Sequence, residues 1–190
     1  MKNPKILYVL LMSVLGCGWL LNGCNSSDSP TIPSTGTHGV LINACSLLTS
    51  AEAEAILGKP VLLVKSDTSY GYMTHCSYVG SINSGFVIPS HVDIVVFTTA
   101  GIQSHPPNNP LTVPTFFASL KTGTALTDQL QLNGIGTDAI WLKKPGKLSF
   151  YKADVQVDVL YRPNGTPVVD TSVAAFEGSK TTALRVAEKI

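Results

Sequence analysis

The chain is short of charge, aromatic residues and cysteine. Its 190 residues include 13 Lys and Arg, 12 Asp and Glu, two Trp and four Cys. Basic and acidic residues are nearly balanced, so the composition does not indicate nucleic-acid binding. The four histidines, His38, His75, His91 and His105, show no metal-ligand spacing, and there is no Gly-x-Ser-x-Gly elbow. We therefore expect no nucleic-acid partner, no metal and no cofactor.

The first 24 residues have the features of an export signal. Lys2 and Lys5 form a short positive region, and the sixteen residues from Ile6 to Leu21 are almost all apolar. This run is shorter than the roughly 20 residues that a helix needs to span a bilayer. Leu21-Asn22-Gly23-Cys24 resembles the lipobox of bacterial lipoproteins. We expect residues 1–23 to be a lipoprotein signal peptide that is cut before an acylated Cys24.

Acylation of Cys24 would attach the protein to a membrane of the bacterial cell envelope. Several acyl chains anchor durably, whereas a single chain binds only reversibly. An uncleaved membrane anchor remains an open alternative. Cys17 is a second candidate for acylation, but a cut before it would leave too short an apolar run and would keep the apolar residues 19–21 in the mature chain. Asn25 is not the aspartate associated with inner-membrane retention in enteric bacteria, so an outer membrane is favoured where the source has one.

The remaining chain divides into a tether and one domain. Residues 24–40 are rich in Ser, Thr, Pro and Gly and contain a single charge at Asp28, which predicts a disordered tether. Residues 41–190 are long enough to form one domain with a sizeable core.

Cys45 and Cys76 are the two cysteines left after the leader and the acylated residue are set aside. In an exported protein such a pair indicates a disulfide, although free buried thiols or a metal pair are alternatives. The bridge would close a loop of about thirty residues, worth roughly 3.5–4 kcal/mol in the chain-entropy model.

Residues 41–190 predict an α+β fold in the order α-βββ-α-βββ-α. Thr49 and Glu52 form a capping-box pattern, and Gly58 ends the helix that it begins. We expect an antiparallel sheet of about six strands with the helices packed on one face. The expected strands are 61–64, 75–79, 92–97, 139–142, 148–150 and 155–161, and the later helices are 114–122 and 179–190. Residues 103–110 are expected to be a surface loop, and 124–133 fit either a short helix or an irregular lead-in.

Residues 43–190 resemble a family of uncharacterised secreted bacterial lipoproteins, best known from actinobacteria. The resemblance is carried by five short segments: Cys45-Ser46-Leu47-Leu48-Thr49, Leu57-Gly58, Cys76-Ser77-Tyr78, Gly134-Ile135-Gly136 and Asp138-Ala139, followed by an Ala-rich closing helix. It implies export and the disulfide. It adds no chemistry, because the family's function is unknown.

Two strings in the sequence imitate catalytic motifs. Ser149-x-x-Lys152 and Lys121-Thr122-Gly123 are typical of penicillin-recognising enzymes, but their order is reversed and the first lies in a strand pattern. Gly134-x-Gly136-x-x-Ala139 imitates a dinucleotide fingerprint, but strand-like residues follow it instead of a helix. We interpret it as a structural turn.

These patterns favour a non-catalytic, lipid-anchored envelope protein that binds a partner protein or a small ligand. The candidate binding surface consists of five aromatic residues: Tyr70, Tyr72, Tyr78, Trp141 and Tyr151. Core packing is the alternative for each of them. Two other functions remain open: an envelope hydrolase whose site, holding His75 or His91, is assembled only by the fold, and a structural or assembly subunit of an envelope complex.

Overall fold

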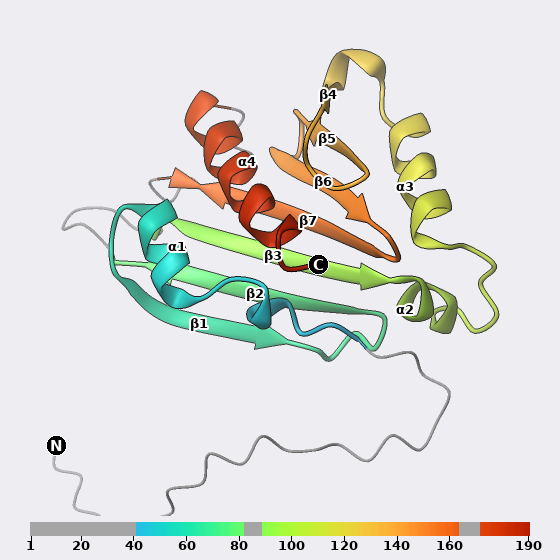
Figure 1. Cartoon of the computed structure of the whole chain (residues 1–190), viewed down its shortest axis with the longest axis horizontal. Helices are drawn as coiled ribbons and strands as arrows, with labels where there is room; N and C mark the ends of the chain where they lie inside the picture. Colours follow the sequence, from blue (N-terminus) through green and yellow to red (C-terminus); the bar gives the residue numbers. More distant parts are fainter. Residues whose placement is uncertain (1–40, 82–88, 164–171) are drawn as a thin grey trace, which may run out of the picture. The chain divides into compact units, whose positions relative to one another are not determined.

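The computed structural model describes residues 41–81, 89–163 and 172–190, which belong to one compact unit (Figure 1). The expected signal peptide (1–23), the expected tether (24–40) and the expected lipidation site Cys24 lie outside the described residues. Within the three described ranges, no helix combines the length and the apolar content needed to span a bilayer.

In the described part of the chain, six helices and seven strands form. The helices are η1 (Ala44–Ser46), α1 (Ser50–Leu57), α2 (Thr99–Ser104), α3 (Val113–Thr122), η2 (Leu126–Asp128) and α4 (Val173–Ala187), of which η1 and η2 are short 3-10 helices. The strands are β1 (Val61–Asp67), β2 (Met73–Gly80), β3 (His91–Thr98), β4 (Gln129–Leu132), β5 (Asp138–Leu142), β6 (Lys147–Lys152) and β7 (Val155–Arg162).

All seven strands form one sheet in the order β1-β2-β3-β7-β6-β5-β4, and every neighbouring pair is antiparallel. Each half of the chain forms a meander, and the two meanders join where β3 pairs with β7, Ile94 lying opposite Val159. The predicted α+β class is therefore confirmed. The strand count is seven instead of about six, because the ambiguous segment before Gly134 supplies the short edge strand β4.

Helix α1 begins and ends where the sequence predicted. The Thr49 hydroxyl accepts a hydrogen bond from the Glu52 backbone N–H, and the Glu52 carboxylate accepts from the Thr49 N–H at 2.7 Å. Gly58 ends the helix in the left-handed conformation with φ of 66°, which glycine adopts without steric cost.

One face of the sheet is covered by α1 and α4, and we call it the covered face (Figure 1). Val92, Ile94 and Val96 alternate along β3 toward this face, and each is at most 1% exposed. They pack with apolar residues of both helices, among them Leu57 of α1 and Val186 of α4. The alternation follows from the two-residue period of a strand.

The prediction that the helices share one face is wrong for α3. Phe117 of α3 packs on Ile140 and Leu142 of β5, which alternate with core residues Ala139 and Trp141. Helix α3 therefore lies on the opposite face, over β5, β6 and β7. The physical reason is that residues 139–142 are apolar at every position, so both sides of β5 must be buried.

The predicted disulfide between Cys45 and Cys76 is present. It joins η1 to β2, with the two Cα atoms 5.0 Å apart and a sequence separation of 31. The alternatives of free thiols or a metal pair are thereby excluded. The bridge fixes the segment that leads into α1 against the covered face.

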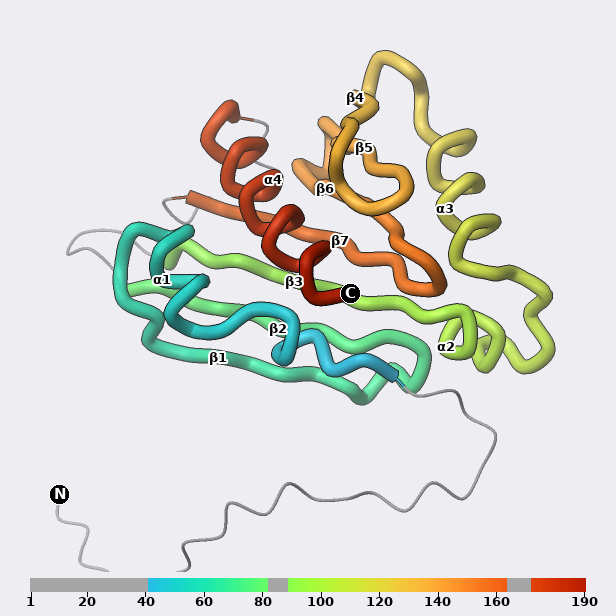
Figure 2. The backbone as a smooth tube through the Cα atoms, viewed as in Figure 1, coloured from blue at the N-terminus to red at the C-terminus, as the bar shows by residue number. Residues whose placement is uncertain are grey.

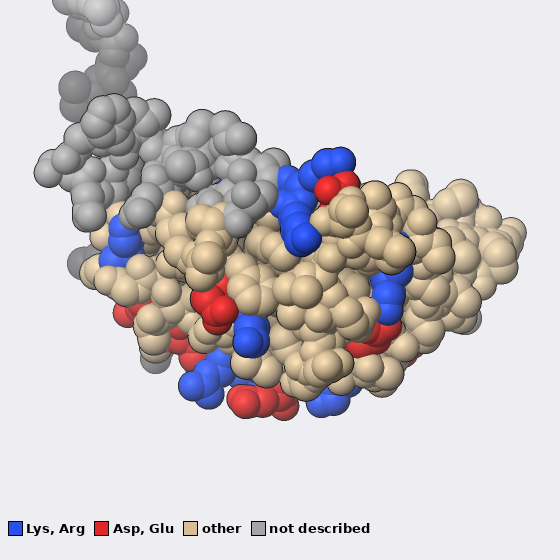
Figure 3. Space-filling model, turned by 90° about the horizontal axis from the view of Figure 1, so that it is seen from above, with Lys and Arg blue, Asp and Glu red and all other residues tan. Residues whose placement is uncertain are grey.

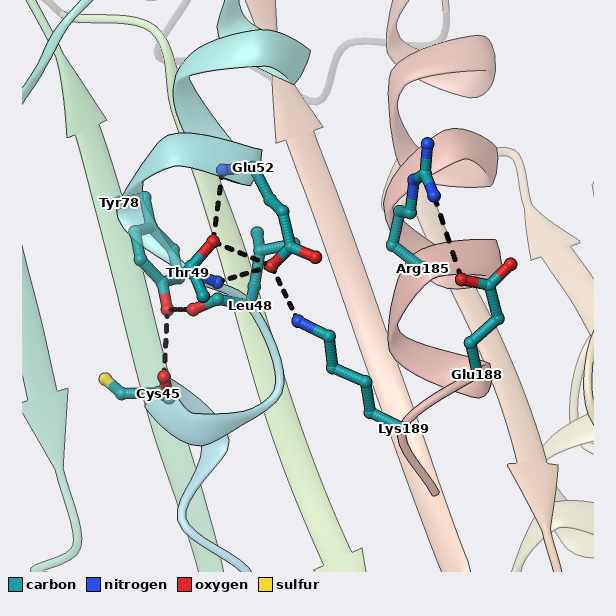
Figure 4. Close-up of polar contacts among 8 residues, drawn as sticks. All are labelled: Cys45, Leu48, Thr49, Glu52, Tyr78, Arg185, Glu188 and Lys189. Carbon is teal, nitrogen blue, oxygen red and sulfur yellow. Dashed lines mark hydrogen bonds and ion pairs between the residues drawn. The ribbon is translucent and has the colours of Figure 1, made fainter.

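Tyr78 reinforces the same junction (Figure 4). Its hydroxyl hydrogen-bonds to the carbonyl of Leu48, and the Cys45 carbonyl lies 3.2 Å from it. The ring is 1% exposed. Burial raises the pKa of Tyr78, so the hydroxyl stays protonated and donates.

An ion pair links the start of α1 to the end of the chain. Lys189, just beyond α4, places its Nζ 2.6 Å from Glu52 Oε2, as Figure 4 shows. The hydrogen bond from Lys189, together with those from Thr49, lowers the pKa of Glu52 from 4.5 to about 2. The carboxylate thus closes the α1 cap and holds the C-terminal segment at once.

Candidate functional site

The face of β2 and β3 opposite α1 and α4, which we call the open face, carries a group of polar side chains. His75 and Ser77 lie on β2, and His91 and Asp93 on β3, with Ser77 directly opposite Asp93. The side chains of His75, Asp93 and His91 are 32%, 19% and 16% exposed. We call these four residues the polar group.

Asp93 is the centre of the polar group. Its Oδ1 lies 3.3 Å from His75 Nε2, and its Oδ2 lies 3.3 Å from His91 Nε2. The Ser77 hydroxyl is also hydrogen-bonded to this carboxylate. His91 Nδ1 lies 3.2 Å from the carbonyl oxygen of Pro89. Both nitrogens of His91 therefore face acceptors, an arrangement that the protonated imidazole satisfies.

The pKa values of the polar group follow from these contacts. The hydrogen bond to Asp93 raises the pKa of His91 above 6.5, against the opposing effect of burial. Burial by itself would raise the pKa of Asp93, but the hydrogen bonds from His91 and Ser77 and the nearby histidines hold it below 3.8. Asp93 and His91 are therefore stabilised as an ion pair.

The polar group is not arranged for nucleophilic catalysis. In a Ser-His-Asp triad the hydroxyl donates to the histidine, which removes its proton. Here the Ser77 hydroxyl is bonded to the carboxylate instead, and both His91 nitrogens face acceptors, Asp93 and the Pro89 carbonyl. The sequence analysis named His75 and His91 as candidates for a hydrolase site, but the role of Asp93 depends on strand register.

The polar group does not form a metal centre either. Across the described residues, no three or more His, Cys, Asp or Glu side chains are placed to hold a metal ion. His75 and His91 contact different oxygens of Asp93.

A second polar group surrounds Asp158 on β7, under the side of the sheet that carries α3. Its carboxylate accepts hydrogen bonds from Lys147 Nζ at 2.5 Å, Ser149 Oγ at 2.6 Å and Gln156 Nε2 at 3.2 Å. Asp158 is only 5% exposed. Because these partners are all within β6 and β7, we assign the group a role in joining the two strands.

Five rings in mutual contact form a strip along one end of the open face. Tyr70 and Tyr72 come from the β1–β2 turn, Phe97 from β3, His105 from the segment after α2, and Phe116 from α3. We call these residues the aromatic strip. Tyr70 is 50% exposed, His105 is exposed, and the other three are partly exposed.

The rings of the aromatic strip are stacked or tilted against one another. The Tyr72 ring stacks on His105, with centroids 4.8 Å apart and planes 13° apart. Its centroid lies 6.2 Å from that of Tyr70 at 67° and 6.5 Å from that of Phe97 at 29°. Phe97 and Phe116 are 5.8 Å apart at 48°. Such edge and offset contacts are favourable aromatic geometries.

Close packing of the β1–β2 turn against α2 fixes the position of the strip (Figure 2). A Cβ atom on Gly101 would lie 2.4 Å from the Tyr72 carbonyl oxygen, so only glycine permits this approach. The Thr98 hydroxyl caps α2 by accepting from the Gly101 N–H at 3.1 Å. Val113 N–H then donates to Thr99 Oγ1 at 2.9 Å and ties the start of α3 to α2.

The structure separates the five aromatic residues proposed from sequence. Tyr70 and Tyr72 lie together in the aromatic strip. Tyr78 and Trp141 are 1% and 4% exposed in the core of the covered face. Tyr151 lies on the other face, with its ring 5.0 Å from that of Phe117. The five therefore do not form one surface.

Phe97, His105 and Phe116 are functional candidates that the sequence interpretation missed. Their signal was available, because residues 94–120 contain four aromatic or imidazole rings and no Asp, Glu, Lys or Arg. What the sequence could not show is that Phe97 and His105 contact Tyr72, and that Phe116 contacts Phe97.

The strings that imitate catalytic motifs are structural. Ser149 bonds to Asp158 on one face, whereas Lys152 Nζ reaches the Ala187 carbonyl at 2.9 Å on the other. Gly136 lies in a turn with φ of 58°, where a Cβ would approach the Tyr151 carbonyl oxygen to 2.4 Å. The interpretation of this glycine turn as structural is confirmed by β5, which follows it.

In the described part of the chain, cavities lie around α3. One of about 460 Å³ is lined by residues that include Leu120, Leu142, Lys144 and Lys147. Both lysines are already paired, Lys144 with Asp128 at 2.6 Å and Lys147 with Asp158. The described residues that line this cavity therefore offer no unpaired lysine for an anionic ligand.

Charged side chains are dispersed on the face shown in Figure 3, where Lys and Arg lie beside Asp and Glu in small mixed groups. The described residues visible on this face form no extended patch of one sign. No protein-family model, no curated protein and no solved structure matches the chain.

Proposed function

We propose that this chain is a non-catalytic, lipid-anchored lipoprotein of the bacterial cell envelope, and that it binds a partner through the aromatic strip. The observation that carries the binding role is the strip itself. Its five rings are partly exposed, in mutual contact and held by a close turn–helix packing. Aromatic residues are enriched at recognition sites, because each ring supplies a large contact area with few rotatable bonds.

Two further observations support the proposal. The Cys45–Cys76 disulfide suits an exported protein, because disulfides persist in oxidising compartments. The polar group contains His, Asp and Ser side chains, but the Ser77 hydroxyl is bonded to Asp93 and not to a histidine. This connectivity favours binding over the alternative of a hydrolase.

The lipid anchor rests on the pattern around Leu21-Asn22-Gly23-Cys24. Metabolic labelling with radioactive palmitate in a bacterial host tests it. We expect label in the full-length protein and in Cys17→Ser, and none in Cys24→Ser. Unlabelled wild-type protein, or label that survives Cys24→Ser, would contradict the anchor.

The binding role has its own test, a capture experiment with the detergent-extracted protein on beads. We expect an envelope component to be retained by wild-type protein and by Leu126→Ala, and lost with Tyr70→Ala. Leu126 is a matched control because it is 86% exposed and lies on η2, outside the strip. Equal retention by all three proteins would place binding elsewhere and refute the proposed role of the strip.

A further inference from the structure

The segments that build the aromatic strip are free of charge. Neither residues 68–74 nor residues 94–120 contain Asp, Glu, Lys or Arg. Proteins that stack nucleic-acid bases on aromatic rings combine them with a positively charged groove for the phosphates. The strip lacks those cations, and so it complements an uncharged ligand.

The ring geometry disfavours a flat ligand. Tyr72, the central ring, is already stacked on His105 and offset from Phe97 within the protein. Successive rings from Tyr70 to Phe116 are inclined by 67°, 29° and 48°. Such a series does not form a coplanar platform on which a flat ligand could stack.

The two tyrosines of the strip also carry hydroxyl groups that can donate hydrogen bonds. In the described part of the chain, neither the Tyr70 nor the Tyr72 hydroxyl has a hydrogen-bond partner. A polyproline II helix has no internal hydrogen bonds, so its backbone carbonyls are free to accept from such hydroxyls. Its proline rings project from a stiff, extended backbone, a shape that packs on exposed aromatic side chains.

We propose that the aromatic strip binds an uncharged, proline-rich polypeptide in the polyproline II conformation. This inference rests on the proposed binding function and names its partner class. The strip is positioned by the scaffold and the ligand is already extended, so little conformational entropy is lost on association.

Fluorescence anisotropy with labelled decaproline tests the proposal, using the full-length protein expressed in bacteria and extracted in detergent. We expect saturable binding of decaproline that is at least about tenfold tighter than binding of a Gly/Ser decapeptide with the same label. Tyr70→Ala should weaken decaproline binding about tenfold, since single aromatic anchors commonly have effects of this size. Tyr72→Phe, which removes only a hydroxyl, should weaken it by a factor of about three.

Leu126→Ala is the matched control and should bind as wild type does. Tyr70 is half exposed, so Tyr70→Ala should keep the wild-type melting temperature, and a weakened affinity then reports lost contact. Equal binding of decaproline and the Gly/Ser peptide, or binding insensitive to Tyr70→Ala, would overturn the proposal.

A neutral oligosaccharide, chitohexaose, separates this inference from the binding function. If chitohexaose binds in a Tyr70-dependent manner and decaproline does not, the peptide proposal fails while the binding role of the strip stands. If neither ligand binds but the capture experiment still depends on Tyr70, the peptide proposal fails alone. The palmitate result is independent of both outcomes.

Discussion

The two faces of β2 and β3 use alternate residues of the same strands for different purposes. Cys76 and Tyr78 point to the covered face, where one forms the disulfide and the other bonds to the Leu48 carbonyl. His75 and Ser77 point to the open face, where His75 is 32% exposed and Ser77 is buried beside Asp93. The comparison teaches that the covered face supplies stability, whereas the open face leaves polar and aromatic groups available for contacts.

The largest expected effect on stability is that of removing the disulfide, which fixes η1 against the covered face. Cys45→Ala/Cys76→Ala should lower the free energy of unfolding by about 3.5–4 kcal/mol, because the unfolded chain regains the entropy of a closed loop. Urea denaturation measures the change. The open-face variant Tyr70→Ala should stay within about 0.5 kcal/mol of wild type. Equal losses in both variants would remove the distinction between the faces.

The same substitution placed on each face sharpens the comparison. Tyr78→Phe should destabilise the protein by about 1–2 kcal/mol, because it leaves the buried Leu48 carbonyl without its donor. Tyr72→Phe should cost less than about 0.5 kcal/mol, since this hydroxyl has no partner among the described residues. Thermal denaturation of the pair checks the prediction, and a larger cost at Tyr72 would contradict it.

Acidic pH should lower the stability of the protein, because it protonates Glu52 on the covered face. Its pKa is lowered from 4.5 to about 2, so its contribution is complete above pH 4.5 and disappears as the pH falls toward 2. Glu52 and Lys189 are each 32% exposed, so solvent screening limits the loss to about 1 kcal/mol. Denaturation of wild-type protein and Glu52→Gln at pH 5 and pH 2.5 should show their stability difference shrinking; a constant difference would refute the ion pair's role.

The smallest effect is expected on the open face at alkaline pH. The pKa of His91 is raised above 6.5 by Asp93, so its stabilising contribution is complete below pH 6.5 and is lost as the pH rises through the raised value. The advantage of wild type over His91→Gln should therefore fall by less than about 1 kcal/mol between pH 5.5 and 8.5. Denaturation at the two pH values measures it. An advantage that grows with pH would contradict the assigned ion pair.

Local sequence signals predicted the elements that local chemistry determines. Helix α1 was predicted from Thr49, Glu52 and Gly58 because its caps are satisfied within a few residues. Helix α2 was missed because it has only six residues, which form no amphipathic repeat, and its one local signal is the N-cap Thr98. The side of the sheet that α3 covers was predicted incorrectly, because that choice depends on both faces of β5.

The candidate site was only partly predictable for a related reason. Tyr70 and Tyr72 stood out as exposed aromatics, but Phe97, His105 and Phe116 join them only through the fold. His75 and His91 were named as site candidates, whereas their shared contact with Asp93 depends on a register that one sequence does not specify.

Hydrogen–deuterium exchange with and without decaproline tests most directly whether the end of the open face binds the peptide and the covered face stabilises the fold. We expect slower exchange in residues 68–74 and 97–116 when the peptide is bound, with α1 and α4 unchanged. Protection confined to α1 and α4, or none anywhere, would contradict the account.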